Sequence, residues 1–179
     1  MYPELIEFWF SEEASKHWFN STKAFDQSLI DTYEGTWVEA RQAKLDHWKQ
    51  SAAGSLALII VLDQLPLNMF RGQPKCFSTE AQSREVARAA IGKDFDQELP
   101  LNQKSFMYMP FMHSEDLDDQ AMAVKLFNKP GLESNYRFAQ HHYNIIERFG
   151  RFPHRNKILG RKSSDAEIEY LNSREGFQG

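Results

Sequence analysis

The chain has 179 residues, a formal net charge of −4 and an isoelectric point near 5.9. This acidic balance argues against a general attraction to nucleic acid or to an anionic membrane surface. The single cysteine, Cys76, excludes an internal disulfide and a cysteine-based zinc cluster, and it fits a reducing compartment. The length suits one domain with a sizeable core, so we expect a single domain over residues 1–179.

The N-terminal sequence Met1–Glu7 has no basic region followed by a clean apolar stretch, so we predict no signal peptide. The longest apolar run, Leu56–Leu62, is too short to span a bilayer. We therefore expect a cytoplasmic protein with no membrane partner and no nucleic-acid partner.

Helical spacing dominates the first part of the chain. Pro3 suits a first helical turn, and the apolar residues after it predict a short helix ending near Phe10. A second helix is predicted where large apolar side chains recur every four residues, at Phe25, Leu29, Tyr33 and Trp37.

The segment Ser55–Leu65 is apolar on nearly all sides, which predicts a buried helix. Pro66 should end this helix or turn it into a second short one. The β-branched residues Ile59, Ile60 and Val61 leave a buried strand as the alternative. We favour the helix because no other segment shows a strand pattern that could pair with it.

Two helices are predicted in the middle of the chain. Thr79–Gln82 resembles a capping box, which would open a helix that Gly92 closes. A short helix over Pro100–Met109 should stop at Pro110, because proline removes a backbone donor.

Three further helices complete the prediction. Ser114 should cap the first of them, with acidic residues in the first turn where the helix dipole favours them. We expect its inward face to consist of Leu117, Ala121 and Val124. A long helix should run over Glu133–Phe149 and end at Gly150, and Ser164–Glu167 is a second capping box that opens a terminal helix.

No segment shows the alternation that is typical of a strand. We therefore predict an all-α domain of about eight helices. No self-match at a period of about 34 residues is visible, so the sequence itself shows no regular helical repeat.

A strongly basic stretch near the end of the chain is the most informative feature. It contains no acidic residue, and its cations are Arg148, Arg151, Arg155, Lys157 and Arg161. Apolar side chains within it should hold it against a core, while its guanidinium groups need partners. Such a loop either binds an anion or is neutralised by acids elsewhere in the chain.

Acidic residues gather around the predicted helix start after His113, at Glu115, Asp116, Asp118 and Asp119. One interpretation is a salt-bridge network that holds the basic stretch to the domain. The other is a polar pocket in which some arginines stay free to bind a carboxylate or phosphate through bidentate contacts. The sequence leaves both open.

Three histidines lie beside these charged elements, at His113, His142 and His154. We choose His142 over the adjacent His141 because it lies on an apolar stripe of its helix. The three are candidates for proton transfer, helped by Glu115. A divalent metal site is the weaker alternative, because no helix carries His-x-x-x-His and dense arginines disfavour a cation, so we predict no metal and no cofactor.

Asp63 and Gln64 are polar exceptions at the end of the predicted buried helix. A buried carboxylate needs a partner, and Arg71 is the nearest candidate in sequence. A local Asp63–Arg71 ion pair is therefore the simpler interpretation, and catalysis by these residues is the other.

Several of these motifs together resemble the bacterial DUF924 family over almost the whole chain. They are Phe8-Trp9-Phe10, Asp63-Gln64, Asn68, Phe70-Arg71-Gly72, Pro110 with His113-Ser114-Glu115-Asp116 and Gln120, and the basic stretch with its core Arg148-Phe149-Gly150-Arg151-Phe152-Pro153-His154-Arg155-Asn156. The resemblance implies a tetratricopeptide-like helical array without obvious sequence repeats, and it implies no activity. This chain departs from the family pattern at Leu67 and at Gln103-Lys104, where the family usually has arginine.

From these features we predict a polar pocket that binds a small anionic molecule, with hydrolysis as an open option. The proton-transfer candidates are His113, Glu115, His142 and His154. The ligand-binding candidates are Asp63, Gln64, Arg71, Arg148, Arg151, Arg155, Asn156 and Arg161. The alternative is a non-enzymatic scaffold that binds a peptide or protein in a helical groove, in which the charged cluster is only architecture. The sequence does not decide whether the protein is an enzyme.

Overall fold

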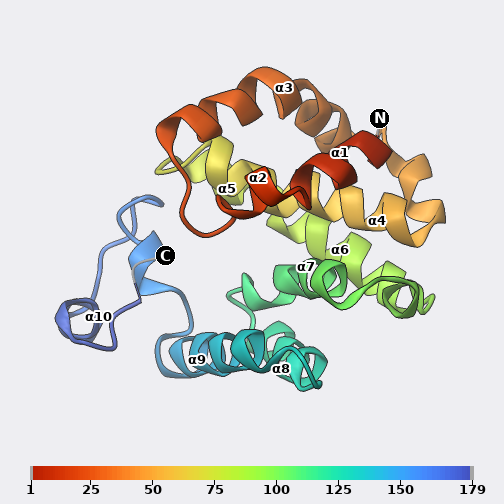
Figure 1. Cartoon of the computed structure of the whole chain (residues 1–179). Helices are drawn as coiled ribbons and strands as arrows, with labels where there is room; N and C mark the ends of the chain where they lie inside the picture. The colour runs from red at the N-terminus through yellow and green to blue at the C-terminus, as the bar shows by residue number, and fades with distance from the viewer. Residues whose placement is uncertain (1, 178–179) are drawn as a thin grey trace. The chain divides into compact units, whose positions relative to one another are not determined.

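The structure is a computed structural model that describes residues 2–177. Every regular element in these residues is helical, which confirms the all-α prediction (Figure 1). The described residues pack into two compact units, one with residues 2–71 and 75–110 and the other with residues 72–74 and 111–177. The single domain over residues 1–179 stays a prediction, because packing units need not be independently folding domains.

The first unit is built around α4 (Ala52–Ile59), which packs against α1 (Tyr2–Trp9) and α6 (Glu80–Ile91). A second pair consists of α3 (Lys23–Arg41) and α5 (Leu65–Met69). The unit also contains α2 (Glu12–Ser15), most of α7 (Leu101–Met112) and the 3₁₀ segments Asp46–Gln50, Pro74–Phe77 and Phe95–Glu98, the second of which begins at the unit boundary. The apolar residues of α4 are buried almost without exception, so this helix forms the centre of the unit.

One continuous helical segment passes through that centre. A π-helical turn, Ile60–Gln64, joins α4 to α5, which confirms the predicted buried helix and excludes the strand. Pro66 has no N–H group, so it cannot donate to the Leu62 carbonyl four residues earlier. The Thr79 hydroxyl donates to that carbonyl at 2.6 Å.

Within the described residues, this segment is the one helix that is long and apolar enough to cross a membrane. Ala52–Met69 spans 18 residues with a mean hydropathy of 1.5, but 89% of it is buried inside the protein. A core helix of a soluble protein passes the same test, so the segment is weak evidence for a membrane span.

Helix α6 begins after Thr79 and ends at Gly92, as predicted, but the predicted capping box is wrong. The Thr79 hydroxyl does not cap the helix, because it donates to the Leu62 carbonyl and accepts a hydrogen bond from Trp37 Nε1 at 3.1 Å. Helix α7 does not stop at Pro110 but continues to Met112. Proline in the last turn removes only one donor, and the residues after it are buried.

The second unit contains α8 (Leu117–Phe127), α9 (Glu133–Phe149), the 3₁₀ segment Pro153–Arg155 and α10 (Asp165–Asn172). Helices α8 and α9 lie side by side, joined by a short turn (Figure 1). Helix α9 ends at Gly150 with φ of 68°, as predicted. The capping box at the start of α10 is also confirmed, since the Ser164 and Glu167 side chains each accept from the other residue's backbone amide.

The start and the buried face of α8 differ from the prediction. Asp116 is the N-cap, because its carboxylate accepts from the amides of Asp118 and Asp119. Ser114, the predicted cap, donates its hydroxyl to Asp119 Oδ2 at 2.7 Å. The buried face carries Gln120, Ala123 and Phe127, whereas the predicted inward residues are exposed or half-buried at Leu117, Ala121 and Val124.

Candidate functional site

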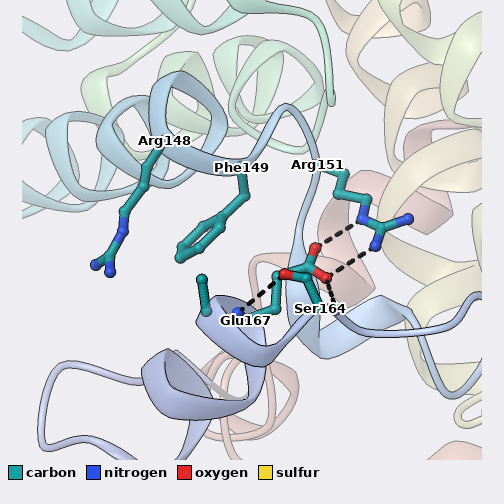
Figure 2. Close-up of a pocket in the computed structure, with 6 residues that line it drawn as sticks. Arg148, Phe149, Arg151, Ser164 and Glu167 are labelled. Atoms are coloured by element: carbon teal, nitrogen blue, oxygen red, sulfur yellow. Dashed lines mark hydrogen bonds and ion pairs between the residues drawn. The ribbon is translucent and has the colours of Figure 1, made fainter.

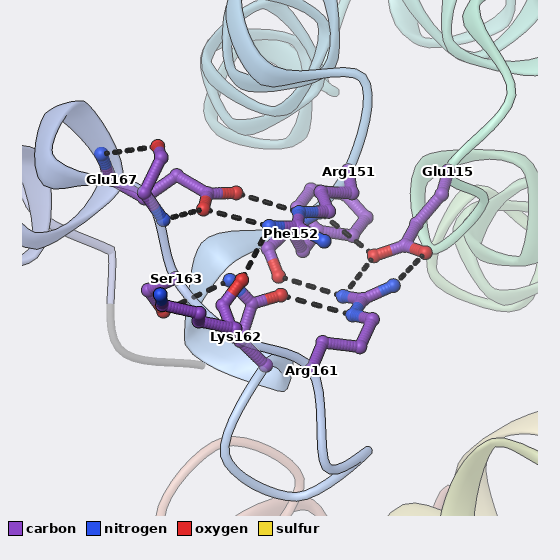
Figure 3. Close-up of polar contacts among 9 residues, drawn as sticks. Glu115, Arg151, Phe152, Arg161, Lys162, Ser163 and Glu167 are labelled. Carbon is purple, nitrogen blue, oxygen red and sulfur yellow. Dashed lines mark hydrogen bonds and ion pairs between the residues drawn. The ribbon is translucent and has the colours of Figure 1, made fainter.

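The basic stretch is tied to the loop before α8 through Glu115 (Figure 3). The Arg161 guanidinium donates to both carboxylate oxygens of Glu115, at 2.7 and 2.8 Å, and the Phe152 amide donates to Oε1 at 2.8 Å. Burial raises the pKa of Glu115, but hydrogen bonds from Arg161 and Phe152 outweigh it and hold the pKa below its usual range. Glu115 is therefore an ionised anchor whose oxygens are both occupied.

A second bidentate pair joins the basic stretch to α10. Arg151 Nε and Nη2 donate to the two carboxylate oxygens of Glu167 at 2.7 and 2.8 Å, and Nη2 also donates to the Lys162 carbonyl at 2.9 Å (Figure 3). The hydrogen bond from Arg151 is the largest cause that lowers the pKa of Glu167 to about 2. The same pair raises the pKa of Arg151. Here the acids of the chain neutralise an arginine that was predicted to bind a ligand.

Two further predicted ligand-binding residues are buried within the basic stretch. Arg155 is 6% exposed, donates to the His113 carbonyl at 2.9 Å and stacks over the Phe152 ring at 4.8 Å. Asn156 accepts from Arg161 Nε at 2.9 Å and donates to the Ser163 hydroxyl at 3.0 Å. Both side chains hold the loop in shape.

A pocket of about 500 Å³ lies where α9 ends and α10 begins (Figure 2). Its lining residues are Arg148, Phe149, Arg151, Ser164, Ala166 and Glu167. The Arg148 guanidinium lies 4.7 Å from the Phe149 ring centroid and 6.0 Å from that of Tyr170. Within residues 2–177 it makes no hydrogen bond and no ion pair, and Figure 2 shows it directed away from the Arg151–Glu167 pair.

The histidines lie in the same unit as the basic stretch. His142 is 6% exposed, and its Nδ1 lies 2.7 Å from the Phe138 carbonyl. Burial is the largest cause that lowers the pKa of His142 to about 3 and that of His154 to about 4. Both imidazoles are therefore neutral at pH 7, but their low pKa values make them weak proton acceptors. Among residues 2–177, no group of three or more His, Cys, Asp or Glu side chains could hold a metal ion.

Comparison with known proteins gives a family and a related structure. A model of a family described as a bacterial protein of unknown function (DUF924) matches residues 5–175. The chain belongs to the DUF924 family. A solved structure of a protein of unknown function, ATU0120 from Agrobacterium tumefaciens, is 36% identical, covers 96% of both chains and has a TM-score of 0.91. No curated protein matches the chain.

The DUF924 motif at the end of the buried helix lies in the first unit. Asp63 is fully buried on the π-helical turn and accepts a hydrogen bond from the Gln64 side chain. The sequence predicted an ion pair between Arg71 and Asp63. In the structure Arg71 pairs instead with Asp26 at 3.0 Å, and it also donates to Asn68 at 3.3 Å. The predicted local pair is wrong because helix α3 brings a carboxylate from 45 residues away.

The sequence predicted Arg148 and Arg151 as ligand-binding residues but not the other residues that line the pocket. The sequence indicated both helix ends that form the pocket, because Gly150 ends α9 just after Arg148 and Phe149 and the capping box at Ser164 starts α10. It did not indicate that these two helix ends lie close together, since that depends on the conformation of the 13 residues between them. A binding or catalytic role for any of these side chains stays a prediction.

Proposed function

We propose that this DUF924 protein binds a small anionic molecule in the pocket lined by Arg148 and Arg151. The observation that carries the proposal is the Arg148 guanidinium, which has no hydrogen bond and no ion pair within the described residues 2–177. An exposed arginine beside a cavity of about 500 Å³ is available for a carboxylate or phosphate, and pockets of this volume suit small molecules.

Charge balance favours a ligand with one anionic group. Arg151 and Glu167 neutralise each other through two hydrogen bonds, so the pocket retains one uncompensated positive charge, on Arg148. The Phe149 ring adds an apolar wall, against which a planar group can pack. These features together suit an aromatic or alkyl ligand that carries a single carboxylate or phosphate.

The remaining basic residues take a supporting part in this proposal. Arg155, Asn156 and Arg161 shape the loop, and Glu115 fixes Arg161, so none of these side chains has to reach the ligand. Hydrolysis would need a proton acceptor at the ligand, and neither the buried His142 nor the half-buried His154 lines the pocket. We therefore propose binding alone. The cytoplasmic location and the tetratricopeptide-like array are expectations that accompany the proposal.

The test is a titration with phenyl phosphate followed by thermal unfolding. At ten times its Kd the ligand should stabilise the protein by about 1.4 kcal/mol, a Tm increase of roughly 3–6 °C for a chain of this size. Arg148→Ala should abolish the increase. Lys157→Ala, which removes an exposed charge from the same stretch but outside the pocket, should retain it. An equal increase in the wild type and in Arg148→Ala would place the anion elsewhere, and no increase in either would end the proposal.

A second candidate is a scaffold that binds a peptide or protein. The observation in its favour is a groove of about 410 Å³ along α8 and α9, lined by Ala121, Val124, Gln140, Tyr143 and Asn144. The exposed side chain of Leu117, one helical turn before Ala121 on α8, extends its apolar character. If this is the function, Val124→Asp should abolish capture of a stoichiometric partner from a cell extract, whereas Arg148→Ala should leave capture unchanged. Extracts that give no stoichiometric partner would count against it.

A further inference from the structure

A cluster of aromatic rings lies under the segment that follows α10. The Phe177 ring centroid lies 4.7 Å from that of His142 and 5.0 Å from that of His154, in edge-to-face geometry. Phe152 contacts the same two imidazoles at 5.3 and 5.5 Å. The Phe177 ring therefore fills a slot whose walls are His142, Phe152 and His154.

Within residues 2–177, the segment that carries Phe177, residues 173–177, is held by hydrogen bonds to Tyr170, by hydrogen bonds within the segment and by the ring contacts of Phe177. The Phe177 amide donates to the Tyr170 hydroxyl at 3.1 Å, and the Ser173 hydroxyl donates to the Tyr170 carbonyl at 2.7 Å. Gly176 passes so close to α10 that a Cβ atom there would lie 2.6 Å from the Tyr170 carbonyl oxygen. Residues 173–175 are exposed, and Phe177 itself is half-buried. Exposed segments at the edge of a packed unit open at a small fraction of the global unfolding free energy.

The imidazoles under this segment offer hydrogen-bond acceptors. A carbonyl oxygen can only accept, so the contact between His142 Nδ1 and the Phe138 carbonyl places the proton on Nδ1 and leaves Nε2 as an acceptor. The buried Nδ1 of His154 has no hydrogen-bond partner within residues 2–177. Burial keeps the pKa of both imidazoles low, so the acceptor nitrogens persist at pH 7.

We propose that His142, Phe152 and His154 form a binding site for a planar aromatic ring that carries a hydrogen-bond donor, and that residues 173–177 are a strap that closes this site with Phe177. The Phe177 ring defines the shape that the slot accepts, and the acceptor nitrogens select a ring with an N–H or O–H group. The site shares no lining residue with the Arg148 pocket, so it is independent of the function proposed above.

The experiment measures acylation of the histidines by diethyl pyrocarbonate, which modifies accessible neutral imidazoles, with peptide mass spectrometry as readout. In Phe177→Ala, labelling of His142 and His154 should be roughly tenfold faster than in the wild type, equivalent to about 1.4 kcal/mol of lost protection. The exposed His47 is the internal reference. Indole at saturating concentration should return the labelling of Phe177→Ala to the wild-type rate, because it supplies both the ring and the N–H donor.

Two further variants separate a strap from a core segment. Gly176→Ala retains the aromatic ring but forces the backbone away from α10, so it should raise the labelling as Phe177→Ala does. Phe138→Ala, the same change at a side chain that is 53% exposed, should leave the labelling unchanged. Amide exchange of Ile145 and Ile146 in α9 should keep its wild-type protection in all three variants.

Any of three results would overturn the proposal. Unchanged labelling of both histidines in Phe177→Ala and Gly176→Ala would show that other parts of the unit shield them. Loss of amide protection at Ile145 and Ile146 would show that residues 173–177 belong to the core. Labelling of Phe177→Ala that indole does not slow would show that the slot does not bind a separate ring.

Discussion

Replacement of Glu167 by glutamine should destabilise the protein through loss of one charge. Glutamine keeps the shape of the side chain and can still accept the Ser164 amide in the capping box, so the change removes mainly the attraction to Arg151. Arg151 is left with a polar partner in place of an anionic one. The stability of the second unit should therefore fall although its helices remain.

The magnitude follows from the pKa of Glu167. A fall from 4.5 to about 2 is equivalent to about 3 kcal/mol of preference for the ionised form in the folded state. The Arg151 side chain is 31% exposed, so solvent screening reduces this value, and we expect the free energy of unfolding to fall by about 2 kcal/mol at pH 7.

The pH dependence gives the prediction its specificity. A carboxylate whose pKa is lower in the folded state than in the unfolded state stabilises the fold above the unfolded value, and this stabilisation is lost as pH falls towards the folded value. The difference between the wild type and Glu167→Gln should thus be complete above pH 4.5 and should vanish as the pH falls to about 2.

Urea unfolding followed by far-UV circular dichroism across this pH range measures both quantities. The matched control is Glu169→Gln, an exposed glutamate on the same helix, which should change the free energy of unfolding by less than about 0.5 kcal/mol. A loss in Glu167→Gln no larger than that of the control at pH 7, or a loss that persists unchanged at pH 2, would refute the reasoning.

Three other changes test the packing. Thr79→Val should cost about 1–2 kcal/mol in urea unfolding, because the Leu62 carbonyl loses its hydroxyl donor; a neutral result would mean that this carbonyl has another partner. Gly54→Ala should cost about 1–3 kcal/mol, since the new Cβ would lie 2.2 Å from the Trp48 carbonyl oxygen, and a wild-type Tm would contradict this contact. His142 is neutral when folded and charges on unfolding, so stability should fall below pH 6.5, by about 2 kcal/mol at pH 5. His142→Phe should reduce that loss, and equal losses in both proteins would assign it to other groups.

Local signals in the sequence were sufficient where the chain completes an interaction within a few residues. Gly150 and the Ser164–Glu167 box are of this kind, because the cap and the amides it satisfies lie within one turn. The Thr79 box has the same pattern, yet its hydroxyl contacts Leu62, 17 residues away. A pattern shows which groups can cap a helix, but it does not show which distant carbonyl competes for them.

The partners of the basic stretch also depend on long-range contacts that the sequence does not reveal. The sequence identified five cations without an acid among them and left two interpretations, a salt-bridge network or a ligand pocket. The structure shows the salt bridges, because Arg151 and Arg161 bind carboxylates 16 and 46 residues away. Arg148 has no anionic partner in residues 2–177 and lines a pocket, and a ligand there stays a prediction. Net charge could not separate them, since the choice depends on which side chains the turns bring within 3 Å.

Glu167 both caps a helix and forms an ion pair. Its carboxylate satisfies the first turn of α10 at the Ser164 amide and closes the preceding loop through Arg151. When that turn frays, Glu167 moves away and the loop loses its ion pair through Arg151 at the same time. Loop and helix should therefore unfold together as one foldon. Because the loop supplies part of the wall of the Arg148 pocket, fluctuations of a short terminal helix set how long that pocket keeps its shape.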